Sequence, residues 1–166
     1  LEKILYTLDR LYDISKVKEI TLESNPGETS LQKLTQLREL GINRLSIGFQ
    51  SLQPKLLTSL SRIHNPEECL STYWNARNAG FDNINVDMLF NIPGQSLEVF
   101  RDDLQQIIRT MVNGGIQYIP MEISSHAIKM HRVDDIDINV GIFTNLSIDH
   151  LDFHGTMEEY FQTKLM

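Results

Sequence analysis

Apolar and polar positions repeat with two different periods between residues 20 and 50. Residues 20–22 form a short β-favouring run, and Asn-Pro-Gly at residues 25–27 is a loop signal. Residues 44–50 return to strand character. Between these runs, leucines recur at helical spacing before a glycine that suits a helix C-terminus: Leu31, Leu34, Leu37, Leu40 and then Gly41. This order predicts a βαβ unit with parallel strands and a right-handed crossover.

The same two periods predict the remaining elements. Residues 1–14 have an amphipathic helix pattern, and Asn65, Pro66 and Glu68 are suited to cap a helix that ends at Gly80. Further helices are expected from Pro54 to Leu60, from Ser96 to Met111 and from Thr156 to Leu165, and further strands over residues 83–90, 117–123 and 139–146. The alternation of strands and helices predicts an α/β fold built from parallel βαβ units.

Candidate chemistry lies where the predicted strands end. Glu23 and Gln50 are the polar residues at the ends of the first two strands, and parallel sheets gather their chemistry beyond the carboxyl ends of their strands. Asp87 is an acid inside an otherwise apolar strand, where an isolated charge is costly. Two interpretations of Asp87 stay open: a carboxylate that caps a neighbouring loop, or a carboxylate that points into a binding site.

Composition narrows the class of protein. The chain has 166 residues, of which 41% are hydrophobic and 22% charged, as in a globular domain with a real core. A formal net charge of −7 argues against a nucleic-acid partner, since phosphate binding needs a basic face. No apolar run approaches the roughly 20 residues of a membrane span, and the helical pattern of residues 1–14 does not suit a signal peptide. A single cysteine, Cys69, excludes an internal disulfide. We expect a cytoplasmic protein.

Ordered motifs in the first part of the chain carry a resemblance to a known family. They are TLESNPG at residues 21–27, NRLSIGFQS at 43–51, RIH at 62–64, NVDM at 85–88 and IPGQ at 92–95. Residues 1–100 resemble the oxygen-independent coproporphyrinogen III oxidase-like radical S-adenosylmethionine proteins, and within them the haem-chaperone branch. The resemblance implies a partial TIM-type barrel and a role in haem or porphyrin metabolism.

The same resemblance implies a cofactor site. Glu23, Gln50, Arg62 and Asp87 correspond to residues that line the S-adenosylmethionine site at the carboxyl face of the barrel. Carboxylate and amide groups can accept hydrogen bonds from the ribose hydroxyls and ammonium of this cofactor, and Arg62 can pair with its carboxylate. The family also holds a [4Fe–4S] cluster on a C-x3-C-x2-C run. No such run occurs in these residues, so they are not expected to form the cluster in the usual way.

A second set of motifs begins beyond residue 110. MEISSHA at residues 121–127, HRV at 131–133 and the run from Gly141 to Tyr160 resemble the central domain of the Mur ligases, specifically the synthetase that adds the third amino acid to UDP-N-acetylmuramoyl dipeptide. The resemblance implies a piece of an α/β domain whose reaction uses ATP and magnesium. It matches Glu122 and His150 to magnesium ligands, Lys164 to a carbamylated lysine, and Ser124 and Arg132 to contacts with the UDP-muramoyl dipeptide.

The second set is chemically consistent, because a carbamylated lysine is an anion that can bind a hard cation together with a carboxylate and an imidazole. A zinc pair formed by His150 and His154 at i, i+4 is the alternative, although no third ligand of suitable type lies near them in the sequence. A G-x-x-G-K-[ST] phosphate loop, which these ligases need, does not occur in the chain.

Three functions follow as hypotheses: a radical S-adenosylmethionine protein of haem metabolism, an ATP-dependent peptidoglycan ligase, and a fused open reading frame without activity of its own. The first is favoured because its match is longer. We expect one part over residues 1–108 and another over residues 109–166, with the join within residues 101–112. The chain begins at Leu1 and stops inside a predicted helix, from which we expect a piece of a longer protein.

Overall fold

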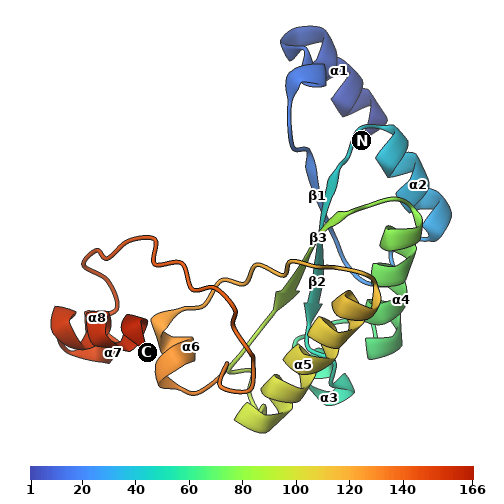
Figure 1. The fold of residues 1–166 in the computed structure, drawn as a ribbon. Helices are drawn as coiled ribbons and strands as arrows, with labels where there is room; N and C mark the ends of the chain where they lie inside the picture. Colours follow the sequence, from blue (N-terminus) through green and yellow to red (C-terminus); the bar gives the residue numbers. More distant parts are fainter. The chain divides into compact units, whose positions relative to one another are not determined.

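The computed structural model describes residues 1–166, which divide into two compact units, Leu1–Gln95 and Ser96–Met166 (Figure 1). The N-terminal unit contains every strand of the structure. The C-terminal unit contains helices and irregular segments. The two units are therefore of different construction.

The N-terminal unit is built on a parallel three-stranded sheet of order β1-β2-β3. Its strands are β1 (Thr21–Ser24), β2 (Arg44–Gln50) and β3 (Asn83–Met88). β2 is the central strand, and it pairs in parallel with both neighbours. The βαβ unit predicted over residues 20–50 is thereby confirmed, and the predicted third strand ends two residues earlier than expected, at Met88 rather than Phe90.

Three helices lie between the strands, at the predicted places: α2 (Leu31–Glu39), α3 (Pro54–Ser59) and α4 (Pro66–Asn78). The predicted helix α1 (Glu2–Tyr12) and a 3-10 turn η1 (Ile14–Lys16) precede β1. The start of α4 is set by local chemistry. Asn65 accepts from the backbone N–H of Glu68, and the Glu68 side chain accepts from the backbone N–H of Asn65. This capping box satisfies two backbone donors that a helix N-terminus otherwise leaves unpaired.

The core of this unit lies on one face of the sheet. Leu45, Ile47 and Phe49 alternate along β2, and each is at most 1% exposed. Figure 1 shows α2 and α4 on one side of the strands, and these helices contribute Leu34 and Tyr73 to the buried set. Because side chains alternate between the two faces of a strand, the intervening residues of β2 lie on the opposite face. That face is polar, and it carries the candidate site.

The apolar side chains of two helices are only partly buried. In α1, Leu5 is buried, whereas Ile4 and Leu11 are more than half exposed. In α4, Cys69 and Tyr73 are buried, but Trp74 is 38% exposed. Periodicity shows which residues share a helix face, but only packing decides how far the neighbouring elements cover that face.

The C-terminal unit contains α5 (Leu97–Asn113), α6 (Ser125–Lys129), α7 (Leu151–His154) and α8 (Met157–Leu165). Its N-caps are again local, since Ser96 and Thr156 each accept from the backbone N–H three residues on. Arg101 on α5 forms ion pairs with Asp134 and Asp135, at 3.5 Å and 3.1 Å. α5 also runs unbroken through residues 101–112, the predicted location of the join.

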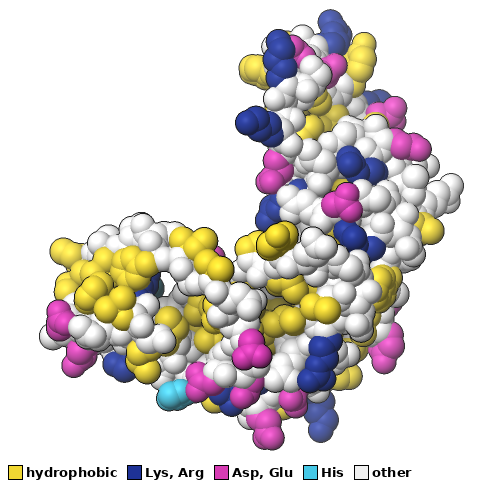
Figure 2. Space-filling view, viewed as in Figure 1, with side chains coloured by type: hydrophobic (Ala, Val, Ile, Leu, Met, Phe, Trp, Pro, Cys, Tyr) yellow, Lys and Arg dark blue, Asp and Glu magenta, His cyan; other side chains and the backbone are white.

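The strands predicted over residues 117–123 and 139–146 are wrong. Both segments are irregular, and neither makes a backbone hydrogen bond to a neighbouring segment. A strand is a paired state, and β-favouring residues such as Val140 and Ile142 do not form one without a partner. These two side chains are 75% and 82% exposed, and Figure 2 shows hydrophobic side chains at the surface of the region that carries α7 and α8.

None of the helices combines the length and apolarity that crossing a lipid bilayer requires.

Candidate functional site

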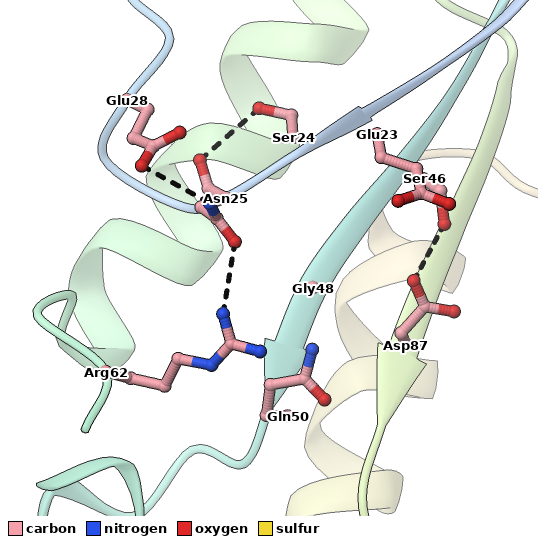
Figure 3. Close-up of a pocket in the computed structure, with 9 residues that line it drawn as sticks. All are labelled: Glu23, Ser24, Asn25, Glu28, Ser46, Gly48, Gln50, Arg62 and Asp87. Atoms are coloured by element: carbon pink, nitrogen blue, oxygen red, sulfur yellow. Dashed lines mark hydrogen bonds between the residues drawn. The ribbon is translucent and has the colours of Figure 1, made fainter. Parts of the chain in front are cut away.

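A cavity of about 420 Å³ opens on the polar face of the N-terminal sheet, toward the carboxyl ends of β1 and β2 (Figure 3). It is lined by Glu23, Ser24, Asn25, Glu28, Ser46, Gly48, Gln50, Arg62 and Asp87. Apart from Gly48, every residue in this set has a polar or charged side chain. The four residues matched to the S-adenosylmethionine site, namely Glu23, Gln50, Arg62 and Asp87, all lie in it, although they come from four separate segments.

Arg62 is held by the loop that follows β1. Its Nη1 donates to Oδ1 of Asn25 at 3.3 Å, and Nδ2 of Asn25 donates to Oε1 of Glu28 at 3.2 Å. The salt bridges of the chain do not include Arg62. The guanidinium is therefore oriented by a neutral amide, and its charge stays available to an anionic group in the cavity.

That loop is fixed at its tip. Gly27 adopts a φ of +79°, which glycine tolerates without strain. Its backbone N–H donates to Oγ1 of Thr72 on α4 at 3.0 Å. A Cβ on Gly27 would lie 3.1 Å from Oε1 of Glu68, so a side chain there would press on the residue that caps α4. The close approach of loop and helix sets the position of Asn25 and hence of Arg62.

Gln50 ends β2 in an unusual conformation. Its φ is +66°, in the left-handed region that non-glycine residues seldom adopt, and the pairing of β2 with β3 is irregular between Gly48 and Gln50. A Cβ on Gly48 would lie 2.7 Å from Nε2 of Gln50. The Gln50 side chain therefore folds back over Gly48 into space that a larger residue would occupy. Backbone strain of this kind is found most often at functional sites.

Asp87 projects from β3 on the cavity face, where it accepts from the hydroxyl of Ser46 at 2.7 Å. Its side chain is exposed. Of the two interpretations left open by the sequence, the structure thus places Asp87 at the cavity, with a side-chain partner on β2, rather than on a loop. The cavity contains three carboxylates and one guanidinium, and this surplus of negative charge suits a ligand with positive charge.

Several cavity residues were not identified from the sequence: Ser24, Asn25, Glu28, Ser46 and Gly48. A signal was present for two of them, because polar or small residues alternate with apolar ones along Arg44–Gln50 and so mark its second face. Asn25 and Glu28 had no such signal. They reach the cavity through the path of a loop, which periodicity does not describe.

The predicted magnesium ligands lie in the C-terminal unit. Glu122 is exposed in the irregular segment before α6. His150 precedes α7 with a φ of +55°, and Nζ of Lys164 lies 5.2 Å from the centre of the Tyr160 ring. No group of three or more His, Cys, Asp or Glu side chains in the chain is arranged to hold a metal ion. The magnesium role of these residues, like the zinc alternative for His150 and His154, stays a prediction.

The predicted UDP-muramoyl dipeptide contacts have structural partners. Ser124 caps α6 by accepting from the backbone N–H of Ala127, and Arg132 is buried, with Nη2 directed at Sδ of Met130. Burial lowers the pKa of the Arg132 guanidinium. Their contact with a substrate stays a prediction.

The side chains of His126, His150 and His154 pack together in the C-terminal unit. His154 is 1% exposed, its Nε2 lies 2.8 Å from Oγ of Ser125, and its ring stacks on Tyr160. His126 stacks on Phe153 with ring centroids 4.0 Å apart. Burial lowers the pKa of His154, with smaller contributions from Lys129, His126 and His150. The cluster therefore packs aromatic and imidazole rings between α6, α7 and α8.

This chain does not contain the set of residues that would hold a [4Fe–4S] cluster. Such clusters are held by several cysteine thiolates. Cys69 is the single cysteine of the sequence, and it is 0% exposed on α4. The four residues matched to S-adenosylmethionine are all present and line one cavity, whereas these 166 residues do not supply the thiolates of a cluster.

Comparison with known proteins assigns the two parts of the chain to different families. The family model of the Radical SAM superfamily matches residues 1–107, and that of the Mur ligase middle domain matches residues 100–166. The two matches overlap within α5. This overlap lies next to the boundary between the two compact units, after Gln95.

Individual relatives show the same division. The heme chaperone HemW of Bacillus subtilis is 37% identical over 99 residues, which are 59% of this chain and 26% of that protein. The UDP-N-acetylmuramoyl-L-alanyl-D-glutamate–2,6-diaminopimelate ligase of Caldanaerobacter subterraneus is 56% identical over 62 residues, 37% of this chain and 13% of the ligase. The chain thus spans about a quarter of the first relative and about an eighth of the second.

A solved structure agrees with the first assignment. Coproporphyrinogen III oxidase (HemN) from Escherichia coli, described as a radical SAM enzyme, matches with a TM-score of 0.52 and 27% identity over 64% of this chain and 26% of that one. This similarity supports the partial TIM-type fold. The chain belongs to the Radical SAM superfamily through residues 1–107, and residues 100–166 are similar to a segment of the Mur ligase middle domain.

Proposed function

We propose that the cavity at the carboxyl edge of the N-terminal sheet binds S-adenosylmethionine. One observation carries the proposal. Glu23, Gln50, Arg62 and Asp87, which lie as far as 64 residues apart in the sequence (87 − 23 = 64), line a single cavity. These are the residues that the family resemblance matched to this cofactor, and they were selected without reference to the cavity.

The chemistry of the cavity supports the same ligand. S-adenosylmethionine carries a sulfonium and an ammonium group, a carboxylate and two ribose hydroxyls. The three carboxylates of the cavity can accept from the ammonium and the hydroxyls, and Arg62 can pair with the carboxylate. A volume of about 420 Å³ lies within the range of small-molecule sites, roughly 300–1,000 Å³.

The proposed function of these 166 residues is binding of the cofactor rather than its reductive cleavage. In the family, the [4Fe–4S] cluster supplies the electron for that cleavage, and the residues that hold the cluster are not part of this sequence. The names of the relatives, heme chaperone and coproporphyrinogen III oxidase, point to haem and porphyrin metabolism as the setting of the N-terminal region. The ligase alternative has no support, because the second match covers only a segment of one domain.

Substitution of Gly48 tests the binding proposal. Purified chain is titrated with S-adenosylmethionine by isothermal calorimetry, and saturable binding at a stoichiometry of one is expected. Gly48→Ala places a Cβ 2.7 Å from Nε2 of Gln50 and so displaces that amide from the cavity. Loss of one well-placed hydrogen-bonding group is expected to weaken binding by about tenfold, with little change in the unfolding midpoint because the displaced atom ends a flexible side chain.

Gly141→Ala is the matched control. A Cβ at Gly141 meets nothing within 4 Å, and this glycine is not among those with positive φ. The Gly141→Ala variant should bind S-adenosylmethionine with the affinity of the unsubstituted chain. Absence of saturable binding by the unsubstituted chain, or equal affinity of the two glycine variants, would contradict the proposal.

Reconstitution with iron and sulfide under anaerobic conditions should produce no visible cluster absorption. A [4Fe–4S] centre needs several thiolates, and the one thiol of this chain is buried on α4. A radical S-adenosylmethionine protein that contains the C-x3-C-x2-C run, prepared in parallel, is the positive control for the procedure. A stoichiometric four-iron cluster in the purified chain would refute this prediction.

A further inference from the structure

Three polar side chains on β2 and β3 form a closed hydrogen-bonded set beside the cavity. Nδ2 of Asn85 donates to Oδ1 of Asp87 at 2.8 Å and to Oγ of Ser46 at 2.9 Å. The hydroxyl of Ser46 in turn donates to Oδ2 of Asp87 at 2.7 Å. Ser46 and Asn85 are register partners in the parallel pairing of β2 and β3, and Asp87 follows Asn85 on the same face of β3.

The chemistry of these side chains determines which group donates each hydrogen bond. An amide nitrogen has two hydrogens, and Asn85 directs one to Ser46 and one to Asp87. A serine hydroxyl has one hydrogen, and Ser46 directs it to Asp87. Each oxygen of the Asp87 carboxylate therefore accepts one bond from a neutral donor. A carboxylate offers about four acceptor positions, so roughly two remain for a ligand in the cavity.

We propose that Asn85 is a positioning residue that holds the Asp87 carboxylate in one orientation toward the cavity. The inference rests on the proposed binding of S-adenosylmethionine. Ser46 and Asp87 line the cavity, whereas Asn85 does not, so Asn85 acts on a ligand through these two side chains. Asp87 is exposed, and without these donors its carboxylate would rotate among several rotamers. Fixing that rotation before the ligand arrives lowers the entropy lost on binding.

Asn43 shows how a purely structural asparagine differs in the same unit. Its Nδ2 donates to the backbone carbonyl of Lys18 at 2.8 Å, and its Oδ1 accepts from the backbone N–H of Ile20 at 2.8 Å. Both partners are main-chain groups, and they secure the segment that enters β1. Both partners of Asn85 are side chains of the cavity wall. The two asparagines thus provide a matched pair for an experiment.

Calorimetric titration of the whole chain with S-adenosylmethionine tests the inference. Asn85→Ala should weaken binding by about tenfold, with an unfolding midpoint close to that of the unsubstituted chain. Asn85→Asp retains the size of the side chain but replaces its donor by an acceptor beside Asp87, so it should weaken binding at least as much. Asn43→Ala should lower the unfolding midpoint and leave the affinity of the folded chain unchanged.

A double-mutant cycle separates positioning from general loosening of the sheet. If Asn85 acts through Asp87, the double variant Asn85→Ala/Asp87→Ala binds no more weakly than Asp87→Ala alone. Additive losses, or an Asn85→Asp variant with the affinity of the unsubstituted chain, would overturn the inference while leaving the proposed function intact. Failure of the unsubstituted chain to bind S-adenosylmethionine would overturn both.

Discussion

Replacing Arg62 with alanine is expected to weaken the binding of S-adenosylmethionine by about 10- to 100-fold. Arg62 is oriented by Asn25 at 3.3 Å and has no carboxylate partner in the protein. Its charge therefore becomes paired when the carboxylate of the cofactor enters the cavity. Hydrogen bonds to charged groups contribute about 1.5–3 kcal/mol each, which sets the expected range.

The choice of ligand makes this prediction specific. 5′-Methylthioadenosine has the nucleoside of the cofactor but lacks its amino acid portion, so Arg62→Ala should leave its affinity nearly unchanged. Arg62→Lys keeps the charge without the planar fork of the guanidinium and should give an intermediate loss for S-adenosylmethionine. Calorimetry with both ligands provides the measurement. Equal weakening for both would show that Arg62 supports the cavity as a whole and does not recognise a carboxylate.

Replacing Leu34 with alanine is expected to lower the free energy of unfolding of the N-terminal unit by about 2–5 kcal/mol. Leu34 is 0% exposed on α2, in the core between this helix, α4 and the sheet. Removing its side chain leaves a cavity that a close-packed interior fills only in part. Since domains are stable by only about 5–15 kcal/mol, the variant would lose a large fraction of the stability of this unit.

Leu31 provides the matched control on the same helix. It is 42% exposed, so Leu31→Ala should cost less than about 1 kcal/mol although it removes the same atoms. Urea denaturation followed by the fluorescence of Trp74, the single tryptophan of the chain, reports on this unit selectively. Similar costs for the two variants would show that α2 is not packed as described.

The two leucines also show which features a sequence pattern can predict and which it cannot. Spacing placed Leu31, Leu34, Leu37 and Leu40 in one helical stripe, and the helix exists at residues 31–39. The degree of burial within the stripe was not predictable, because Leu34 and Leu37 are buried and Leu31 is exposed. Periodicity describes the direction of side chains around one axis, whereas burial depends on the extent of the neighbouring elements.

In the C-terminal unit, a sequence pattern predicted strands that the structure does not contain. Residues 117–123 and 139–146 have β-favouring composition, yet both are irregular because no neighbouring strand pairs with them. The two longer helices of the same unit begin where they were predicted, with Ser96 and Thr156 as their N-caps. A cap needs partners only three residues away, while a strand needs a partner distant in the sequence.

By itself, the sequence determined the parallel βαβ unit and the helix starts, since these depend on spacing and on local residue chemistry, and its motifs carried the resemblance of each part to a known family. Strand positions marked Glu23, Gln50 and Asp87 as candidate site residues, and the family resemblance matched these three and Arg62 to one cofactor site. Only the tertiary structure decided that these four line one cavity, that Gln50 folds over Gly48, and that Asn85 reaches Asp87 and Ser46. The physical reason is that such contacts depend on strand register and loop path, which bring distant residues together and leave no periodic trace along the chain.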